Sequence, residues 1–246
     1  VLIMGCGYRY SDVLLFSDLC RDVKGIDVIP NFYSDGFMNT FSGELNNNKS
    51  ILRSLLYSFR RRNGCKRYYS YLEKQSGFKL SHKSANLFSY NGEKLPFEDG
   101  QFDVIISNAV LEHVMNPNAF FREASRVTKK GGLSYHLYHN YYSFSGGHMA
   151  KSDCFKNPWG HLRGIYRTSD YHLNKIKIDA LSSIFFDYFG DHQVFATDKN
   201  HNKKGLDESF EYEQEKLLRD EIKIQLQKFP TEMLLSRGYL LLGYKK

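Results

Sequence analysis

Short apolar runs that end at glycine or polar turns recur along the chain and predict buried strands. Longer, helix-like stretches separate most of them, as expected for a sheet of mostly parallel strands. The predicted strands are Val1–Met4, Val23–Val28, Ala85–Tyr90, Phe102–Ser107, Leu133–Tyr138, His192–Thr197 and a closing Gly238–Tyr244. The alternation predicts an α/β fold, with one doubly wound domain over residues 1–246.

Helical periodicity and capping residues predict the elements between these strands. Ser11-Asp12 offers an N-cap for a helix that runs to Cys20, and Pro117 can occupy the first turn of another. The basic, glycine-rich run Lys129–Gly132 is interpreted as the end of that second helix. The other predicted helices are Ile51–Arg62, Tyr68–Gln75, Ile176–Phe189 and the charged, amphipathic Glu208–Phe229.

Three segments depart from the simple alternation. Residues 31–80 are long for a single crossover and are interpreted as a helical insertion or cap beside the site, with a turn at Asn46–Asn48. Residues 139–175 are rich in Tyr, His, Gly and Ser and follow the carboxyl end of a strand, where open α/β sheets bind ligands. They are predicted to be binding-site loops. Residues 205–246 are expected to form a C-terminal helix and the final strand.

The opening strand leads into a glycine turn with nucleotide-binding character. Gly5 and Gly7 allow a ligand to approach the backbone closely, and Asp27, at the end of the next strand, can accept hydrogen bonds from both ribose hydroxyls. The alternative for Asp27 is a strand-end acid in a turn. Tyr10 stands where dinucleotide enzymes need a third glycine, which argues against a pyrophosphate ligand and an NAD-dependent reductase.

A second segment carries a more specific pattern. It contains Leu95–Phe97 (LPF), Phe102–Ile105 (FDVI), Leu111–Val114 (LEHV) and Arg126–Gly132 (RVTKKGG) in order. This pattern resembles class I S-adenosylmethionine (SAM)-dependent methyltransferases of the "LPF…FDVV…LEHV…RVLKPGG" branch, over about residues 1–138. The resemblance implies a Rossmann-like, mostly parallel seven-stranded sheet with helices on both faces and an antiparallel last strand. It also implies SAM as cofactor.

The resemblance further assigns cofactor contacts to individual positions. Those implied are Gly5, Cys6, Gly7, Asp27, Asn91, Gly92, Ser107 and Asn108. Asn91 stands where the family usually has an acid near the adenine amino group. The side-chain oxygen of Asn91 can still accept a hydrogen bond from that amino group. His113 matches a family histidine that is more often structural than catalytic. Ile3 replaces an acid common in the first strand, which together with the missing third glycine puts cofactor affinity in doubt.

Methyl transfer to a hydroxyl needs a base, and three histidines are the candidates. His148 and His161 lie in the predicted loops, and His139 directly follows the fifth strand; Asp153 is a weaker candidate. Each could instead be a hydrogen-bonded loop residue. Residues 141–148 and 157–163 bear a looser resemblance to bacterial methyltransferases of surface polysaccharides and sugars. A small-molecule or sugar hydroxyl is therefore the expected acceptor.

The net charge of +7 and the basic residues between Arg60 and Arg67 keep other methyltransferase classes open. An RNA or protein substrate is one alternative, and a non-catalytic scaffold with a methyltransferase-like fold is another. Base methylation of nucleic acid is disfavoured, because Ser107–Val110 stands where amino-directed enzymes carry an Asn/Asp-Pro-Pro-aromatic run and no proline precedes a cysteine.

Cysteine spacing and hydropathy bear on metal content and compartment. The four cysteines stand far apart and form no CxxC pair: Cys6, Cys20, Cys65 and Cys154. No metal site is therefore expected. Scattered thiols also predict a reduced, cytoplasmic setting. Neither a membrane span nor a signal peptide is visible, although the chain opens directly on a strand.

Overall fold

The computed structural model describes residues 1–29, 32–33, 38, 41–42, 45, 50–81, 85–166, 173–197 and 215–246. They form two compact units, Val1–Phe97 and Glu98–Lys246, which are described separately. The turn predicted at Asn46–Asn48 lies outside the described residues, as does the first part of the helix predicted from Glu208.

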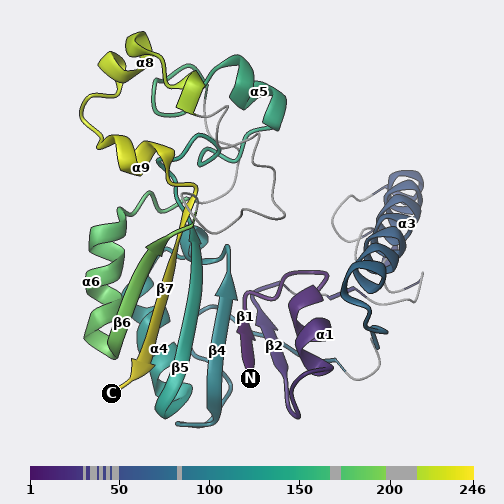
Figure 1. The fold of residues 1–246 in the computed structure, drawn as a ribbon. Helices are drawn as coiled ribbons and strands as arrows, with labels where there is room; N and C mark the ends of the chain where they lie inside the picture. Colours follow the sequence, from purple (N-terminus) through teal and green to yellow (C-terminus); the bar gives the residue numbers. More distant parts are fainter. Residues whose placement is uncertain are drawn as a thin grey trace. The chain divides into compact units, whose positions relative to one another are not determined.

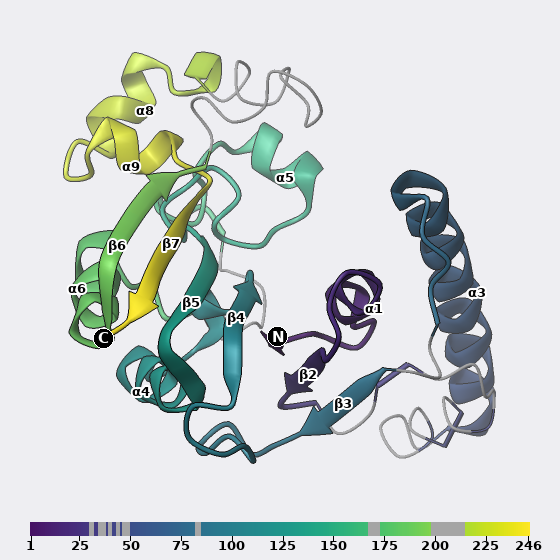
Figure 2. The same cartoon turned by 60° about the horizontal axis from the view of Figure 1, so that its bottom comes forward.

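Three parallel strands form the centre of the first unit, as the apolar runs predict (Figures 1 and 2). They are β1 (Leu2–Met4), β2 (Lys24–Asp27) and β3 (Asn86–Ser89), in the order β3-β2-β1. Helix α1 (Ser11–Ser17) packs against β2 at Gly25, where an added Cβ would lie 2.5 Å from Val13 Cγ2. The helix ends at Ser17, so the prediction that it reaches Cys20 was too long.

Helix α3 (Ile51–Ser76) is a single helix of 26 residues, which corrects the prediction of two helices separated near Asn63-Gly64 (Figure 2). The buried residues of α3 are Ser54, Ser58, Cys65 and Tyr69. They recur at helical spacing and so lie along one face of the helix. Tyr69 ties this face to the rest of the unit, because its hydroxyl donates to the backbone carbonyl of Arg9 at 2.7 Å.

Four strands in the order β4-β5-β7-β6 form the sheet of the second unit (Figure 1). They are β4 (Phe102–Asn108), β5 (Thr128–His139), β6 (Phe189–Ala196) and β7 (Gly238–Lys245). β4 and β5 are parallel, whereas β7 pairs antiparallel with both β5 and β6. Helices α4 (Pro117–Val127) and α6 (Ile178–Tyr188) pack against each other beside these strands.

The start of α4 agrees with the sequence prediction, and its end does not. Pro117 is in the first turn, and the Asn116 side chain accepts the Ala119 N–H at 3.0 Å as a cap. The helix stops at Val127, and Lys129–Gly132 already belongs to β5. The pairing of β4 with β5 is irregular at these residues, and Gly131 has φ of 73°. The glycines therefore allow a bulge in the strand and do not end the helix.

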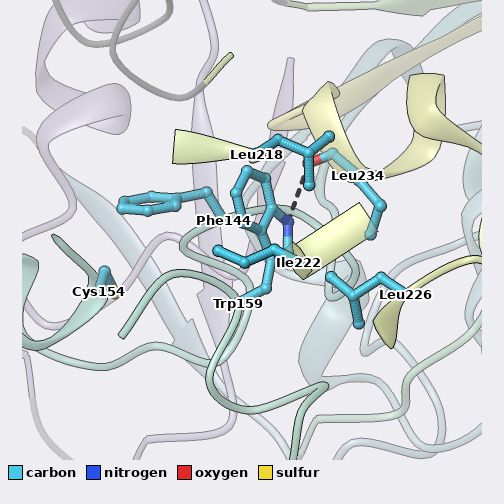
Figure 3. Packing of buried hydrophobic residues seen from close by; sticks show 7 residues of the cluster. All are labelled: Phe144, Cys154, Trp159, Leu218, Ile222, Leu226 and Leu234. Carbon is cyan, nitrogen blue, oxygen red and sulfur yellow. Dashed lines mark hydrogen bonds between the residues drawn. The ribbon is translucent and has the colours of Figure 1, made fainter. Parts of the chain in front are cut away.

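A small helical lobe lies beyond the carboxyl end of β5 (Figure 1). It contains α5 (Lys151–Lys156), α8 (Asp220–Gln225) and α9 (Thr231–Leu235). Their side chains pack around Trp159 in a buried cluster (Figure 3), made of Phe144, Cys154, Trp159, Leu218, Ile222, Leu226 and Leu234. The sequence analysis predicted one helix that ends at Phe229. This prediction is wrong for the described part of that segment, where α8 covers only Asp220–Gln225.

Strand number and direction confirm the predicted fold class. The described residues contain seven strands, and the pairs β1–β2, β2–β3 and β4–β5 are parallel, while the last strand, β7, is antiparallel to its neighbours. Within the described part of the chain, none of the helices combines the length and the apolar character that a membrane crossing needs.

Candidate active site

The turn after β1 is built from two glycines in left-handed conformation. Gly5 and Gly7 both have φ of 68°, a backbone conformation that glycine adopts at little cost. The N–H groups of Gly5 and Cys6 both donate to the carbonyl of Ile26 in β2, at 2.8 and 3.1 Å. These two hydrogen bonds tie the glycine turn, which follows β1, to the neighbouring strand β2.

Asp27 completes this attachment at the end of β2. Its Oδ2 accepts the Gly7 N–H at 2.7 Å, and its Oδ1 accepts the Ile29 N–H at 3.2 Å. A carboxylate offers about four acceptor sites, so each oxygen keeps a lone pair for a ligand hydroxyl. Cys6 is not a nucleophile here, because burial, with a further contribution from Asp27, raises the pKa of its thiol to about 12.

A cavity of about 830 Å³ lies between the glycine turn and α3. Its walls combine aromatic rings and guanidinium groups. The guanidinium carbon of Arg61 lies 3.6 Å from the ring centroid of Tyr8, and that of Arg9 lies 4.6 Å from the ring centroid of Tyr68. The lining residues are Cys6, Gly7, Tyr8, Arg9, Ser11, Tyr57, Arg60, Arg61, Gly64, Cys65 and Tyr68. Sequence reasoning picked out the turn and the basic residues around Arg60 and Arg61 separately, but it did not predict that tyrosines line the space beside them.

Asn91 and Gly92 form a turn after β3, as predicted. The Asn91 side-chain oxygen accepts the Glu93 N–H at 3.0 Å, and Gly92 has φ of 86°. The Asn91 side chain is exposed and its oxygen keeps one lone pair, so it can still accept from a ligand amino group.

Ser107 and Asn108 end β4 but face different surroundings. Ser107 is fully buried, and its hydroxyl lies 2.7 Å from Nδ1 of His136 in β5. Asn108 is exposed at the end of the strand. A contact from Ser107 to a cofactor would therefore have to come from its backbone, whereas Asn108 can offer its side chain.

Two of the three candidate bases, His139 and His148, lie in direct contact in the second unit. His139 Nδ1 and His148 Nε2 are 2.8 Å apart, and the other ring nitrogen of His139 lies 3.2 Å from Ser145 Oγ. Burial lowers the pKa of His139 to about 4, and burial also lowers the pKa of His148. Both rings are therefore neutral near pH 7.

Glu112, which the sequence analysis did not single out, joins this pair. It belongs to the short 3-10 helix η2 (Leu111–His113) and is 2% exposed. Its Oε2 accepts the backbone N–H of His139 at 3.4 Å, and its Oε1 is buried with no hydrogen-bond partner in the described structure. One donor atom each from Glu112, His139 and His148 lie within 4.8 Å of one another, a spacing that can hold a metal ion. Burial raises the pKa of Glu112.

His161 is held separately from that pair. Its Nε2 lies 2.8 Å from the carbonyl oxygen of Tyr141, so Nε2 carries the proton and Nδ1 carries the lone pair. Nδ1 is buried without a hydrogen-bond partner among the residues described, and burial lowers the pKa of His161 to about 4. The ring packs on Gly147, where an added Cβ would lie 2.7 Å from His161 Cγ. Asp153, the weaker candidate, lies in α5.

Comparison with known proteins identifies the central part of the chain. A family model described as a methyltransferase domain matches residues 70–135. The resemblance found in the sequence is confirmed over this segment, which includes Asn91, Gly92, Ser107, Asn108 and Glu112. The glycine turn, Asp27 and the three candidate bases lie outside the matched methyltransferase segment.

Curated relatives of this methyltransferase segment carry the same description. An uncharacterized methyltransferase of Mycobacterium sp. (strain KMS) is 36% identical over 95 residues, which cover 39% of this chain and 36% of that protein. One from Mycolicibacterium gilvum (strain PYR-GCK) is 34% identical over 106 residues, covering 43% of this chain and 40% of that protein. The chain thus spans less than half the length of these relatives.

Among solved structures, the whole chain is similar to the YcgJ protein of Bacillus subtilis, with 16% identity and a TM-score of 0.48 over 100% of this chain and 91% of that one. It is also similar to a SAM-dependent methyltransferase of Thermotoga maritima, with 13% identity and a TM-score of 0.46 over 100% of this chain and 81% of that one.

Proposed function

We propose that this chain is a SAM-dependent methyltransferase that transfers a methyl group to a hydroxyl of a small molecule or sugar. The observation that carries the proposal is the hydrogen bond from Gly7 to Asp27, in a chain whose residues 70–135 match the family model of a methyltransferase domain. This bond holds the glycine turn and the acid at the ends of two adjacent parallel strands, which is where α/β sheets bind ligands.

In this proposal each residue of the first unit has a defined task toward the cofactor. The free lone pairs of Asp27 accept the ribose hydroxyls, and the backbone of Gly5 and Gly7 borders the methionine portion. Asn91 accepts from the adenine amino group. The bound cofactor supplies an electrophilic methyl group on its sulfonium. The missing acid at Ile3 removes one acceptor that the family often provides, so we expect binding to depend strongly on Asp27.

The acceptor oxygen must attack the methyl carbon as the sulfur departs, and the hydroxyl proton must leave. Alignment of the two reactants contributes several powers of ten to the rate. The second unit presents His139, His148 and His161 as neutral imidazoles, the form that can accept a proton. Of these, His161 has the lone pair of Nδ1 fixed by the hydrogen bond at Nε2.

A polyanionic acceptor, such as RNA, is the second candidate function, and one observation favours it. Arg60, Arg61, Lys66 and Arg67 are exposed on α3, and the first two line the cavity beside the glycine turn. A phosphate-rich acceptor bound there would release counterions, so its affinity would fall steeply with salt concentration. A neutral sugar or small-molecule acceptor would show little such dependence.

The test of the proposal is cofactor binding by Asp27 variants. Calorimetric titration with SAM and with S-adenosylhomocysteine should show micromolar binding to the wild type. Asp27→Asn should weaken it by about 10–100-fold, because a hydrogen bond to a charged group contributes about 1.5–3 kcal/mol. Asp18→Asn removes the same charge from an exposed residue of the same unit and should leave affinity unchanged.

Two results would contradict the proposal at different points. A folded wild-type chain that binds neither compound would favour a methyltransferase-like scaffold without catalysis. Binding that Asp27→Asn leaves intact would remove the site from the glycine turn. If binding is confirmed, S-adenosylhomocysteine release should be measured with a panel of sugars and other hydroxyl compounds, and with RNA as the competing class.

A further inference from the structure

We propose that the second unit binds a divalent transition-metal cation of the Zn²⁺ class through Glu112, His139 and His148. Cation binding goes beyond the proposed function and does not depend on it. The three donors come from separate segments: η2, the end of β5 and the turn that follows Gly146-Gly147. Their donor atoms nevertheless lie within 4.8 Å of one another.

The spacing of the two imidazoles is close to that of a shared cation. Tetrahedral zinc with bonds of about 2.0–2.1 Å places two nitrogen ligands about 3.3 Å apart. His139 Nδ1 and His148 Nε2 are 2.8 Å apart without a cation. A change of about half an ångström, which small rotations of the two rings can supply, is enough to admit the ion.

Ser145 contacts both histidines, the ring of His139 and the backbone of His148. Its Oγ lies 3.2 Å from His139 Nε2, and accepting the proton there leaves the lone pair of His139 on Nδ1, the atom that faces His148. Its backbone carbonyl accepts the backbone N–H of His148 at 3.0 Å, which holds the main chain there but not the ring. Metal-binding histidines commonly donate their second N–H to such an outer partner, which fixes the ring and its tautomer.

The backbone of His148 is in the left-handed conformation. Its φ is 55°, in the left-handed region where non-glycine residues are uncommon. Such strain persists only where the surroundings enforce it, and it concentrates at functional sites. Here it places the His148 ring against His139 on one side, and near the ring of His113 at 5.1 Å between centroids.

The buried carboxyl of Glu112 is an independent indication of a positive ligand. Its backbone is held by Asn174, whose N–H donates to the Glu112 carbonyl at 2.9 Å and whose side chain donates to Leu111 and Val114 carbonyls. The Glu112 side chain is 2% exposed, and its Oε1 has no hydrogen-bond partner among the described residues. A buried carboxylate oxygen without a hydrogen bond is costly, and a bound cation would offset that cost.

The donor set selects the class of ion. Two imidazoles and one carboxylate suit Zn²⁺ and its transition-metal neighbours, whereas Mg²⁺ and Ca²⁺ prefer oxygen ligands. Three protein ligands leave a coordination position open.

The experiment measures metal binding directly, without SAM. Untagged full-length chain is stripped with a chelator, dialysed and titrated with Zn²⁺ by calorimetry, and with Co²⁺ by visible absorption, which reports imidazole coordination. One equivalent should bind to the wild type and raise its Tm. Glu112→Gln and His148→Asn should each weaken binding at least tenfold, and Ser145→Ala should weaken it less.

The matched control is His192→Gln, which removes an exposed histidine of β6 in the same unit and should bind like the wild type. Glu112→Gln keeps the shape of the side chain and removes a buried charge, so folding should survive, and circular dichroism checks it. The proposal is overturned if the folded wild type binds no stoichiometric Zn²⁺ or Co²⁺, or if Glu112→Gln and His148→Asn bind as tightly as it does.

Discussion

Replacing Trp159 with alanine is expected to lower the free energy of unfolding by about 3–5 kcal/mol, as for other fully buried tryptophans. Trp159 is 0% exposed and stands at the centre of the helical lobe (Figure 3). Its ring meets Phe144 edge to face, with 5.4 Å between centroids, and its Nε1 donates to the Leu234 carbonyl at 3.2 Å. Alanine would leave a large cavity and an unpaired buried carbonyl.

The size of this effect follows from what the lobe is made of. Its helices are only five or six residues long, too short to be stable on their own. They are held by side chains that converge on one ring, and Leu218, Ile222 and Leu226 supply one side of it. Loss of the ring should therefore loosen the whole lobe rather than a single contact.

Urea unfolding followed by far-UV circular dichroism measures this loss, with Trp159→Phe as the matched control. Phenylalanine keeps an aromatic ring but not the N–H donor, so a smaller loss is expected. In the wild type, fluorescence of this single tryptophan reports the same transition. A loss below about 1 kcal/mol for the alanine variant would contradict the packing described here, because it falls below the range for buried large-to-small changes.

The strands were predictable because their signal is local. Apolar runs bounded by glycines mark buried parallel strands, and β1, β2 and β4 follow those runs closely. The glycine turn and Asp27 were also predictable, since a turn after one strand and an acid after the next must meet at one sheet edge. Their hydrogen bond confirms that they meet.

Helix α3 was not predictable as one element, because its buried face is made largely of small polar residues. Ser54, Ser58 and Cys65 are buried, whereas Leu52 and Leu56 are 70% and 53% exposed. A hydrophobic pattern therefore points to the wrong face of this helix. The basic residues near Asn63-Gly64 are then interpreted as the end of a helix. The helix in fact continues for more than three turns beyond them.

The site residues of the second unit depend on contacts between distant segments. The resemblance implied that Ser107 contacts the cofactor. Side chains alternate between the two faces of β4, and the Ser107 side chain points toward His136. Glu112 carried no sign of burial, since charged residues are rarely buried. The contact between His139 and His148 arises from the turn at Gly146-Gly147, whose path cannot be read from local sequence. The assignment of a base among the three histidines stays a prediction.

Acid is expected to destabilise the chain through His136, a residue with no proposed part in catalysis. Its ring is 0% exposed, and its two nitrogens lie 2.7 and 2.6 Å from the hydroxyls of Ser107 and Ser134. Three aromatic rings surround it, those of Phe120, Phe121 and Phe185. Burial in this setting lowers the pKa of His136 to about 3.

The direction of the effect follows from where the proton binds. An unfolded chain protonates this histidine below pH 6.5, its ordinary pKa, whereas the folded chain does so only near pH 3. Between these values the unfolded state binds more protons, so stability falls as the pH falls. At pH 4.5, two units below the ordinary value, His136 alone should reduce the free energy of unfolding by about 2–3 kcal/mol.

The measurement compares the wild type with His136→Gln by urea unfolding at pH 7.5 and 4.5. Glutamine can keep hydrogen bonds to the serines but cannot take up a proton. The variant should be less stable at pH 7.5 by about 1–2 kcal/mol, since its hydrogen bonds and packing are poorer. That deficit should shrink or reverse at pH 4.5, where only the wild type carries the penalty of His136.

All other histidines are present in both proteins, so the change in the deficit isolates this residue. An equal deficit at both pH values would mean that the imidazole can be protonated in the folded state, and that the core around β4 and β5 is not closed to water.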